Sequence, residues 1–232
     1  MPKISCTIDD GLALLRIDDG KANAMNFDFF EGLNEALDTA TAAKARALVI
    51  QGRGPFFSGG LDLKLVPSLS ADELRRLATE MASAVLRVWG LGIPTVAALE
   101  GHAVGGGAIL AFACDGRVAR NGPGQLYLSE VAIGIPLPTW AMIVSQSVIA
   151  LPYQTRIILH ASPIPWEEAL EIGLVDTLLA STEDLSAAAR AAAQKLAVID
   201  RNAYAVTKSR LRQAHIDAAL RSLETDFADQ IP

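Results

Sequence analysis

The sequence contains few of the residues that build metal centres or disulfide frameworks. Its 232 residues include only two cysteines and three histidines. Two thiols in a chain of this length do not indicate a disulfide framework, and no CxxC or HxxxH pattern is present. The histidines are far apart in the sequence, which argues against a zinc site built from neighbouring residues. We therefore expect no metal, and a reducing cytoplasmic location is the simplest expectation.

Basic runs and uninterrupted apolar spans are also missing. The chain has 20 Lys and Arg against 26 Asp and Glu, a formal net charge of −6, and no run of five basic residues. Because non-specific nucleic-acid binding depends on neutralising phosphates, no nucleic-acid partner is expected. Residues 131–154 carry no charge, but a glycine and three prolines interrupt them. They predict a buried loop and helix rather than a membrane span, and the N-terminal residues lack the apolar core of a signal peptide.

What the chain does contain is enough apolar sequence for one large domain. Apolar residues make up 51% and charged residues 20%, which excludes a disordered chain. Short runs rich in Leu, Val and Ile predict strands over residues 11–17 and 46–51, with a helix over 27–43 between them. Two parallel strands require such a crossover. The pattern therefore favours an α/β fold.

Further elements follow along the chain. Ser70 and Glu73 form a capping-box pattern, which predicts a helix that runs to about Trp89. The remaining predictions are strands over 95–99 and 116–119, and helices over 108–114, 165–172, 184–199 and 203–228. Pro165 is expected at the first turn of its helix, and Gly173 is expected to end it.

The last fifty residues are helical in pattern, and a boundary near residue 180 divides the chain. We expect a core over residues 1–180 and a helical region over 181–232. The helix over 203–228 is amphipathic, and a tail of this kind is expected to pack against a neighbouring subunit. Its predicted buried positions are Leu211, Ile216, Leu220, Leu223 and Phe227.

Two glycine-rich segments, residues 52–60 and 101–107, are predicted to be loops. Neither contains GxGxxG, and the chain has no GK[ST] or GxSxG, so dinucleotide, P-loop and nucleophile-elbow sites are excluded. Glycines allow close approach to a ligand, and two N–H groups aimed at one oxygen would form an oxyanion hole. The same spacing also fits two tight turns with no ligand, so both interpretations stay open here.

Glu130 is the carboxylate with the most unusual setting, in the apolar stretch LYLSEVAIGIP. Burial would raise the pKa of this side chain, so that it could transfer protons near neutral pH. A helix cap or an arginine partner is an equally good explanation from this stretch alone. Glu100 and Asp62 have the positions of structural residues, at a strand end and in a turn.

Five segments together match known signatures: KANAMN (21–26), FFSGGLDLK (56–64), GHAVGGGAILAFACDGRVA (101–119), SEVAIGIP (129–136) and EEALEIGLVD (167–176). In this order they resemble the crotonase, or enoyl-CoA hydratase/isomerase, superfamily over residues 10–210. The resemblance implies an α/β fold of repeated ββα turns that form a spiral of two roughly perpendicular sheets, with a C-terminal helical trimerisation region. It also implies an acyl-CoA thioester as substrate, no cofactor beyond its coenzyme A moiety, and a homotrimer or dimer of trimers.

The family pattern also assigns roles to individual residues. The N–H groups of Leu61 and Gly106 would form the oxyanion hole, and Glu130 would be the catalytic carboxylate. The residues expected to bind substrate or coenzyme A are Lys21, Ala22, Ala24, Met25, Gly59, Gly60, Asp62, Leu63, Lys64, Gly105, Ser129 and Trp140. The chain ends at Pro232, shorter than is usual for the family, so we expect a shortened trimerisation region.

One departure from the family pattern bears on the reaction. Hydratases of this family usually have two glutamates, but here Ile109 occupies the first position and only Glu130 remains. One carboxylate can remove a proton at C2 and return it at C4, which favours a 3-enoyl-CoA to 2-enoyl-CoA isomerase. The stretch SEVAIGIPLPTW also resembles 3,2-enoyl-CoA isomerases, with Ser129 in place of Asn. A hydratase that uses Glu130 alone and a non-catalytic acyl-CoA-binding subunit are the alternatives.

Overall fold

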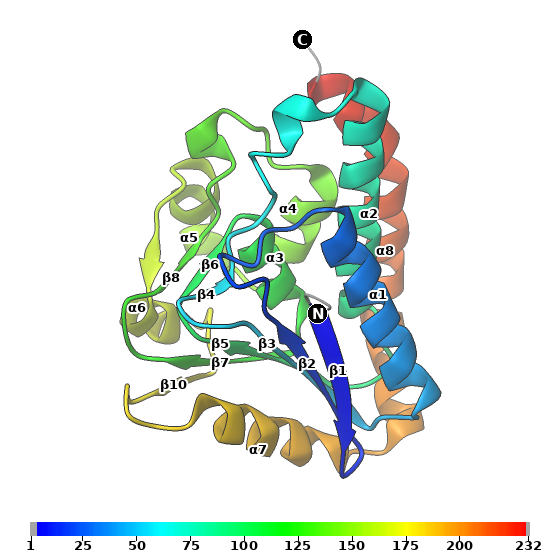
Figure 1. Ribbon diagram of the computed structural model, residues 1–232, viewed down its shortest axis with the longest axis vertical. Helices are drawn as coiled ribbons and strands as arrows, with labels where there is room; N and C mark the ends of the chain where they lie inside the picture. The colour runs from blue at the N-terminus through cyan, green and yellow to red at the C-terminus, as the bar shows by residue number, and fades with distance from the viewer. Residues whose placement is uncertain (1–3, 231–232) are drawn as a thin grey trace.

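The fold is built on two β-sheets, seen in the computed structural model that describes residues 4–230 and the side chains of residues 4–226 (Figure 1). The larger sheet has the strand order β1-β2-β3-β5-β7-β10, and the smaller has the order β4-β6-β8-β9. The first comprises β1 (Ile4–Asp9), β2 (Leu12–Ile17), β3 (Ala47–Gln51), β5 (Thr95–Leu99), β7 (Gly116–Arg120) and β10 (Thr177–Leu179). The second comprises β4 (Phe56–Ser58), β6 (His102–Val104), β8 (Gln125–Tyr127) and β9 (Ile164–Pro165).

Helices connect and cover these strands. They are α1 (Phe27–Ala42), α2 (Ala71–Trp89), α3 (Gly106–Ala113), α4 (Thr139–Gln146), α5 (Leu151–Gln154), α6 (Trp166–Glu171), α7 (Leu185–Ala197) and α8 (Arg201–Gln230). Shorter helical turns are η1 (Val66–Ser68), η2 (Val131–Ile133) and the π-helical η3 (Thr155–Leu159).

A ββα unit occurs three times in succession, as β3-β4-α2, β5-β6-α3 and β7-β8-α4. The first strand of each unit joins the larger sheet and the second joins the smaller sheet. Strands β3, β5 and β7 pair in parallel, and so do β4, β6 and β8. The repetition confirms the predicted α/β architecture of successive ββα turns.

Local sequence explains the elements that were predicted correctly. Strands β3 and β5 are nearly continuous apolar runs and are buried along almost their whole length, as parallel strands covered on both faces must be. Ser70 caps α2, its side chain accepting from the Glu73 N–H while Glu73 accepts from the Ser70 N–H. The predicted capping box is therefore confirmed.

Several segments differ from the sequence-based prediction. Strand β1 was not expected; it pairs with β2 as an antiparallel hairpin, and its exposed polar positions hide it from an apolar pattern. Strands β4 and β6 lie within the segments predicted to be loops, because strands of three residues show no periodicity. Pro165 is the N-cap of α6 and part of β9 rather than a residue of its first turn.

The main hydrophobic core lies between the sheets and helices α1 to α4, and a second core lies under α7. Helix α7 packs across β3, β5 and β7 on the other face of the larger sheet, at the bottom of Figure 1. Leu185, Ala189 and Ala193 contribute the helix side of this second core. Both faces of the central strands are thus covered.

Helix α8 packs along α2 and α4 with one face only. Ile216 is buried and Leu223 is half-buried, as predicted. The prediction that Leu211 and Leu220 are buried is wrong, since their exposed fractions are 67% and 43%. Both side chains lie away from the face of α8 that contacts α2 and α4. The amphipathic pattern did not show how wide that face is. The side chain of Phe227 lies outside the described residues.

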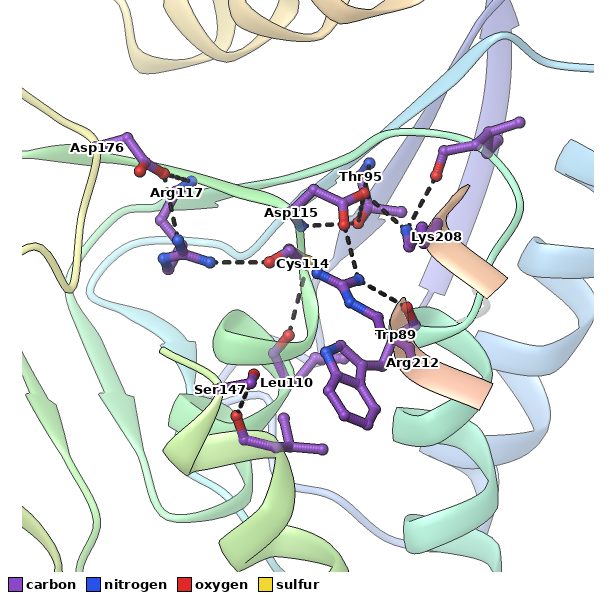
Figure 2. Close-up of polar contacts among 12 residues, drawn as sticks. Trp89, Thr95, Leu110, Cys114, Asp115, Arg117, Ser147, Asp176, Lys208 and Arg212 are labelled. Atoms are coloured by element: carbon purple, nitrogen blue, oxygen red, sulfur yellow. Dashed lines mark hydrogen bonds and ion pairs between the residues drawn. The ribbon is translucent and has the colours of Figure 1, made fainter. Parts of the chain in front are cut away.

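A buried ionic cluster joins α8 to the larger sheet (Figure 2). Asp115 accepts hydrogen bonds from Lys208 Nζ and Arg212 Nη1, each at 2.7 Å, and from the Thr95 N–H at 2.8 Å. Arg212 also donates to the Trp89 carbonyl at 2.7 Å. Although burial opposes ionisation, the two cations outweigh it and hold the pKa of Asp115 below its ordinary value.

The uncharged residues 131–154 form η2, α4 and α5. Trp140, Ala141 and Val144 of α4 are buried, but the preceding loop is largely exposed, so only the helical part of that prediction holds. No helix among residues 4–230 is both long and apolar enough to cross a bilayer.

Candidate active site

Two segments far apart in the sequence, residues 22–25 and 59–62, run side by side. The Gly59 N–H donates to the Ala22 carbonyl, and the Met25 N–H donates to the Gly60 carbonyl, both at 2.8 Å. The Asp62 N–H in turn donates to the Met25 carbonyl at 2.9 Å. These bonds join the predicted early loop to the first glycine segment.

Two fully buried side chains hold this junction in place. The Asn23 amide donates to the carbonyls of Phe56 and Phe57 in β4, both at 3.1 Å. The Ser58 hydroxyl donates to the Asn23 carbonyl at 2.8 Å and accepts from the Gly60 N–H at 3.1 Å. Neither residue was among the predicted site residues; the available signal was that both stand inside the quoted motifs.

Gly60 brings the first glycine segment against the second. Its φ is +79°, and a Cβ at this position would lie 2.7 Å from the Val104 carbonyl oxygen and 3.0 Å from the Gly106 nitrogen. Gly106 is the first residue of α3, where N–H groups have no partner within the helix. Among the described residues, neither the Leu61 nor the Gly106 N–H donates a backbone hydrogen bond. The residue before Leu61 thus lies against Gly106, and neither predicted oxyanion-hole donor is taken by a backbone hydrogen bond among the described residues.

Glu130 lies at the same edge of the second glycine segment. A Cβ at Gly105 would lie 3.1 Å from Glu130 Oε1 and 3.3 Å from Ser129 Oγ. Glu130 Oε2 is buried without a hydrogen-bond partner among the described residues. Burial raises the pKa of Glu130, with a smaller opposing effect from the backbone N–H groups of residues 129 and 130. A carboxylate whose pKa is raised in this way is a stronger base than an exposed one.

The position at which hydratases have the glutamate that this chain lacks is apolar in the structure as well as in the sequence. Ile109 lies in the first turn of α3 with an exposed fraction of 1%, packed into the main core. Its N–H donates to the Gly105 carbonyl at 3.1 Å. Among the described residues, Glu130 is therefore the carboxylate that lies against Gly105, whereas Glu100, which lies against Gly54, is paired with Arg120.

The other predicted residues fall into two groups. The contacts above join Ala22, Met25, Gly59, Gly60, Asp62, Gly105 and Ser129 into one site, and Ala24 lies within the same loop. Lys21, Leu63 and Lys64 are exposed beside these segments, whereas Trp140 is buried in the main core. Asp62 also accepts from the Lys64 N–H at 3.2 Å, as a residue in a turn does, and Glu100 pairs with Arg120 at the end of its strand.

One large cavity lies away from this site. A cavity of about 670 Å³ borders the Asp115 cluster and is lined in part by Trp89, Arg117 and His215. It includes none of the predicted site residues. Among the described residues, no cluster of His, Cys, Asp and Glu could hold a metal ion.

Repeated ββα units whose glycine-rich turns meet one buried carboxylate define a crotonase fold. Comparison with known proteins gives the same result. The family model described as enoyl-CoA hydratase/isomerase matches residues 7–229. A probable enoyl-CoA hydratase of Bacillus subtilis is 34% identical over 202 residues, covering 85% of this chain and 77% of the relative. The chain belongs to the enoyl-CoA hydratase/isomerase family.

Other relatives carry isomerase names. Peroxisomal enoyl-CoA delta isomerase 1 of Arabidopsis thaliana is 30% identical over 196 residues, covering 79% of each chain. A solved Mycobacterium tuberculosis enoyl-CoA isomerase is 30% identical with a TM-score of 0.91, covering 99% of both chains. A second structure of that protein is described as a probable enoyl-CoA hydratase. The names of these relatives therefore do not show whether the chain catalyses isomerisation or hydration.

Proposed function

We propose that the protein is an enoyl-CoA isomerase that converts a 3-enoyl-CoA into a 2-enoyl-CoA, with Glu130 as its one acid/base residue. The observation that carries the proposal is the contrast between two positions beside Gly105. Glu130 presents a buried carboxylate there, whereas Ile109 contributes a buried hydrocarbon side chain.

The proposed reaction needs one proton to move between two carbons of the substrate. The Glu130 carboxylate removes a proton from C2, and the electrons pass into a dienolate whose negative charge develops on the thioester oxygen. The Leu61 and Gly106 N–H groups stabilise that oxygen. Each such donor is worth roughly 10²- to 10³-fold in rate. Glu130 then delivers the same proton to C4, so that the double bond lies between C2 and C3 and the enzyme is unchanged.

Burial supports this role for Glu130. A carboxylate with a raised pKa is a stronger base than an exposed one, so it takes the C2 proton more readily. The coenzyme A moiety is proposed to bind residues 21–25 and 62–64. Lys21 and Lys64, which belong to these segments, are exposed. No cofactor beyond that moiety is proposed, because the thioester itself makes the C2 proton acidic.

Hydration of a 2-enoyl-CoA is the second candidate. The similarity to the probable hydratase of Bacillus subtilis favours it, and so does Ser129 Oγ, which lies beside Glu130 at Gly105 and could orient a water molecule. A chain that binds acyl-CoA without turnover is the third candidate.

A paired assay on the purified protein separates these candidates. One arm supplies a 3-enoyl-CoA and follows 2-enoyl-CoA, and the other supplies a 2-enoyl-CoA and follows the 3-hydroxyacyl-CoA. We expect turnover in the first arm and its loss in Glu130→Gln, with acyl-CoA binding retained. Turnover only in the second arm would replace the isomerase by the hydratase. Binding without product in either arm would favour the non-catalytic subunit.

A further inference from the structure

The N-terminus of α4 is capped by a residue from the far end of the chain. The N-cap position is Pro138, whose side chain makes no capping bond. Instead, Asp226 of α8 accepts from the Thr139 N–H at 2.9 Å and from the Thr139 hydroxyl at 2.6 Å. One carboxylate thus satisfies a free helix donor and meets the positive end of the α4 dipole.

The position of Asp226 is poorly suited to the stability of its own helix. It lies near the C-terminal end of α8, where the helix dipole disfavours a negative charge. The Ser222 hydroxyl lies 3.2 Å from its Oδ2 and shares its proton between that oxygen and the Ala219 carbonyl, which is at 2.8 Å. The contribution of this carboxylate is therefore to α4 and to the segment that enters α4.

That segment begins at Glu130. The Ile135 N–H donates to the Glu130 carbonyl at 2.9 Å, and the Gly134 N–H donates to the Val131 carbonyl at 3.2 Å. Residues 131–134 are exposed, whereas Leu137 packs against the main core. The exposed part of the segment is thus held at its two ends, by the glycine-rich site around Glu130 and by Leu137 together with the Asp226 cap at Thr139.

We propose that Asp226 is a positioning residue, which fixes the orientation of Glu130 by anchoring the other end of the segment 131–139. The inference rests on the proposed acid/base role of Glu130. It makes the C-terminal helix part of the active-site framework. Loss of the cap lets residues 131–138 move, which displaces the carboxylate from the substrate.

The kinetic test compares Asp226→Ala with Asp217→Ala. Asp217 is an exposed carboxylate on the same helix that bonds only Gln213, at 2.8 Å, among the interactions of described residues. Assays run well below each melting temperature. We expect Asp226→Ala to lower kcat about 10- to 100-fold, the effect of misplacing a catalytic group by an ångström or less. KM should stay nearly constant, and Asp217→Ala should match the wild type. A normal kcat in Asp226→Ala with a lower melting temperature would overturn the proposal.

Variants at the partner residue extend the test if Asp226→Ala folds poorly. Thr139→Ser keeps both donors and should retain full kcat. Thr139→Val keeps only the N–H and should lie between the wild type and Asp226→Ala. Equal activity of Thr139→Ser and Thr139→Val would contradict a positioning role.

Hydrogen exchange gives a readout that does not need turnover. We expect Asp226→Ala to speed exchange of the Gly134 and Ile135 amides, which lie next to Glu130. Faster exchange confined to residues 139–141 would mean that the cap affects α4 alone, and would overturn the proposal. Activity of Glu130→Gln separates the two claims: full turnover there refutes the proposed function, whereas an inactive Glu130→Gln with a normal Asp226→Ala refutes only the positioning.

Discussion

The Ser58 hydroxyl bridges the Asn23 carbonyl and the Gly60 N–H, at 2.8 and 3.1 Å. It occupies the Gly60 donor, while the next N–H along the chain, that of Leu61, makes no backbone hydrogen bond among the described residues. Asn23 is 1% exposed and has a φ of +53°, a conformation that its three amide-donated bonds to backbone carbonyls hold in place. The bridge thus links the early loop to the proposed oxyanion hole.

Ser58→Ala should weaken the oxyanion hole without touching the substrate. Removing the hydroxyl leaves a buried N–H and a buried carbonyl without this partner, which costs about 1–3 kcal/mol of stability. The freed Gly60 N–H also lets the Leu61 peptide rotate, so kcat/KM should fall at least tenfold, by about 1.4 kcal/mol or more. Denaturant unfolding and steady-state kinetics measure the two effects. Ser68→Ala, which removes an exposed hydroxyl, is the control, and an equal response in both variants would contradict the bridge's role.

Gly60→Ala should lower turnover strongly, whereas Gly173→Ala should not. Both glycines have a φ close to +78°, so both alanine variants carry the same backbone strain, of about 1 kcal/mol. Only at Gly60 would the methyl group also meet backbone atoms, the Val104 oxygen at 2.7 Å and the Gly106 nitrogen at 3.0 Å. The clash separates the two proposed donors, and a loss of about 10²-fold in kcat/KM is expected. Comparable activity of the two variants would show that the close approach is unimportant.

Glu130→Gln should inactivate the protein and stabilise its fold at neutral pH. The pKa of Glu130 is raised by burial above its ordinary value of 4.5, so the folded state binds this proton more tightly than the unfolded state does. The wild type therefore loses stability as pH rises from the unfolded pKa through the folded pKa. Glutamine carries no charge and avoids this loss. We expect a higher melting temperature than the wild type at pH 8, with the difference vanishing near pH 4; a pH-independent difference would argue against a buried ionisable group.

Asp115→Asn should destabilise the fold far more than loss of a surface ion pair. The substitution leaves Lys208 and Arg212 buried without a counter-charge, which costs about 3–5 kcal/mol. Because the pKa of Asp115 is lowered, its contribution is present above its ordinary pKa of 3.8 and is lost as pH falls through the folded pKa.

The matched control for Asp115→Asn is Asp9→Asn. Asp9 pairs with Arg190 at the surface, where such a pair contributes about 0–1 kcal/mol. Urea denaturation at pH 7 and pH 3 measures both variants. Similar free energies of unfolding for the two would mean that the buried cluster does not hold α8 to the sheet.

Sequence alone determined the elements whose signals are local. The capping box of Ser70 and Glu73 and the apolar runs of β3 and β5 predict their elements, because these signals depend on residues a few positions apart. The motifs around Gly60, Gly105 and Glu130 predicted the family, which the comparisons confirm. Their meeting in one site was implied only by that resemblance.

Tertiary structure decided what depends on long-range contacts. Strands β4 and β6 exist because they pair with each other, since three residues carry no periodic signal of their own. The face of α8 that contacts α2 and α4 leaves Leu211 and Leu220 exposed, which composition could not predict. The Asn23–Ser58 bridge and the Asp226 cap join residues 35 and 87 positions apart in the sequence. Such contacts arise only when the packed chain brings their partners together.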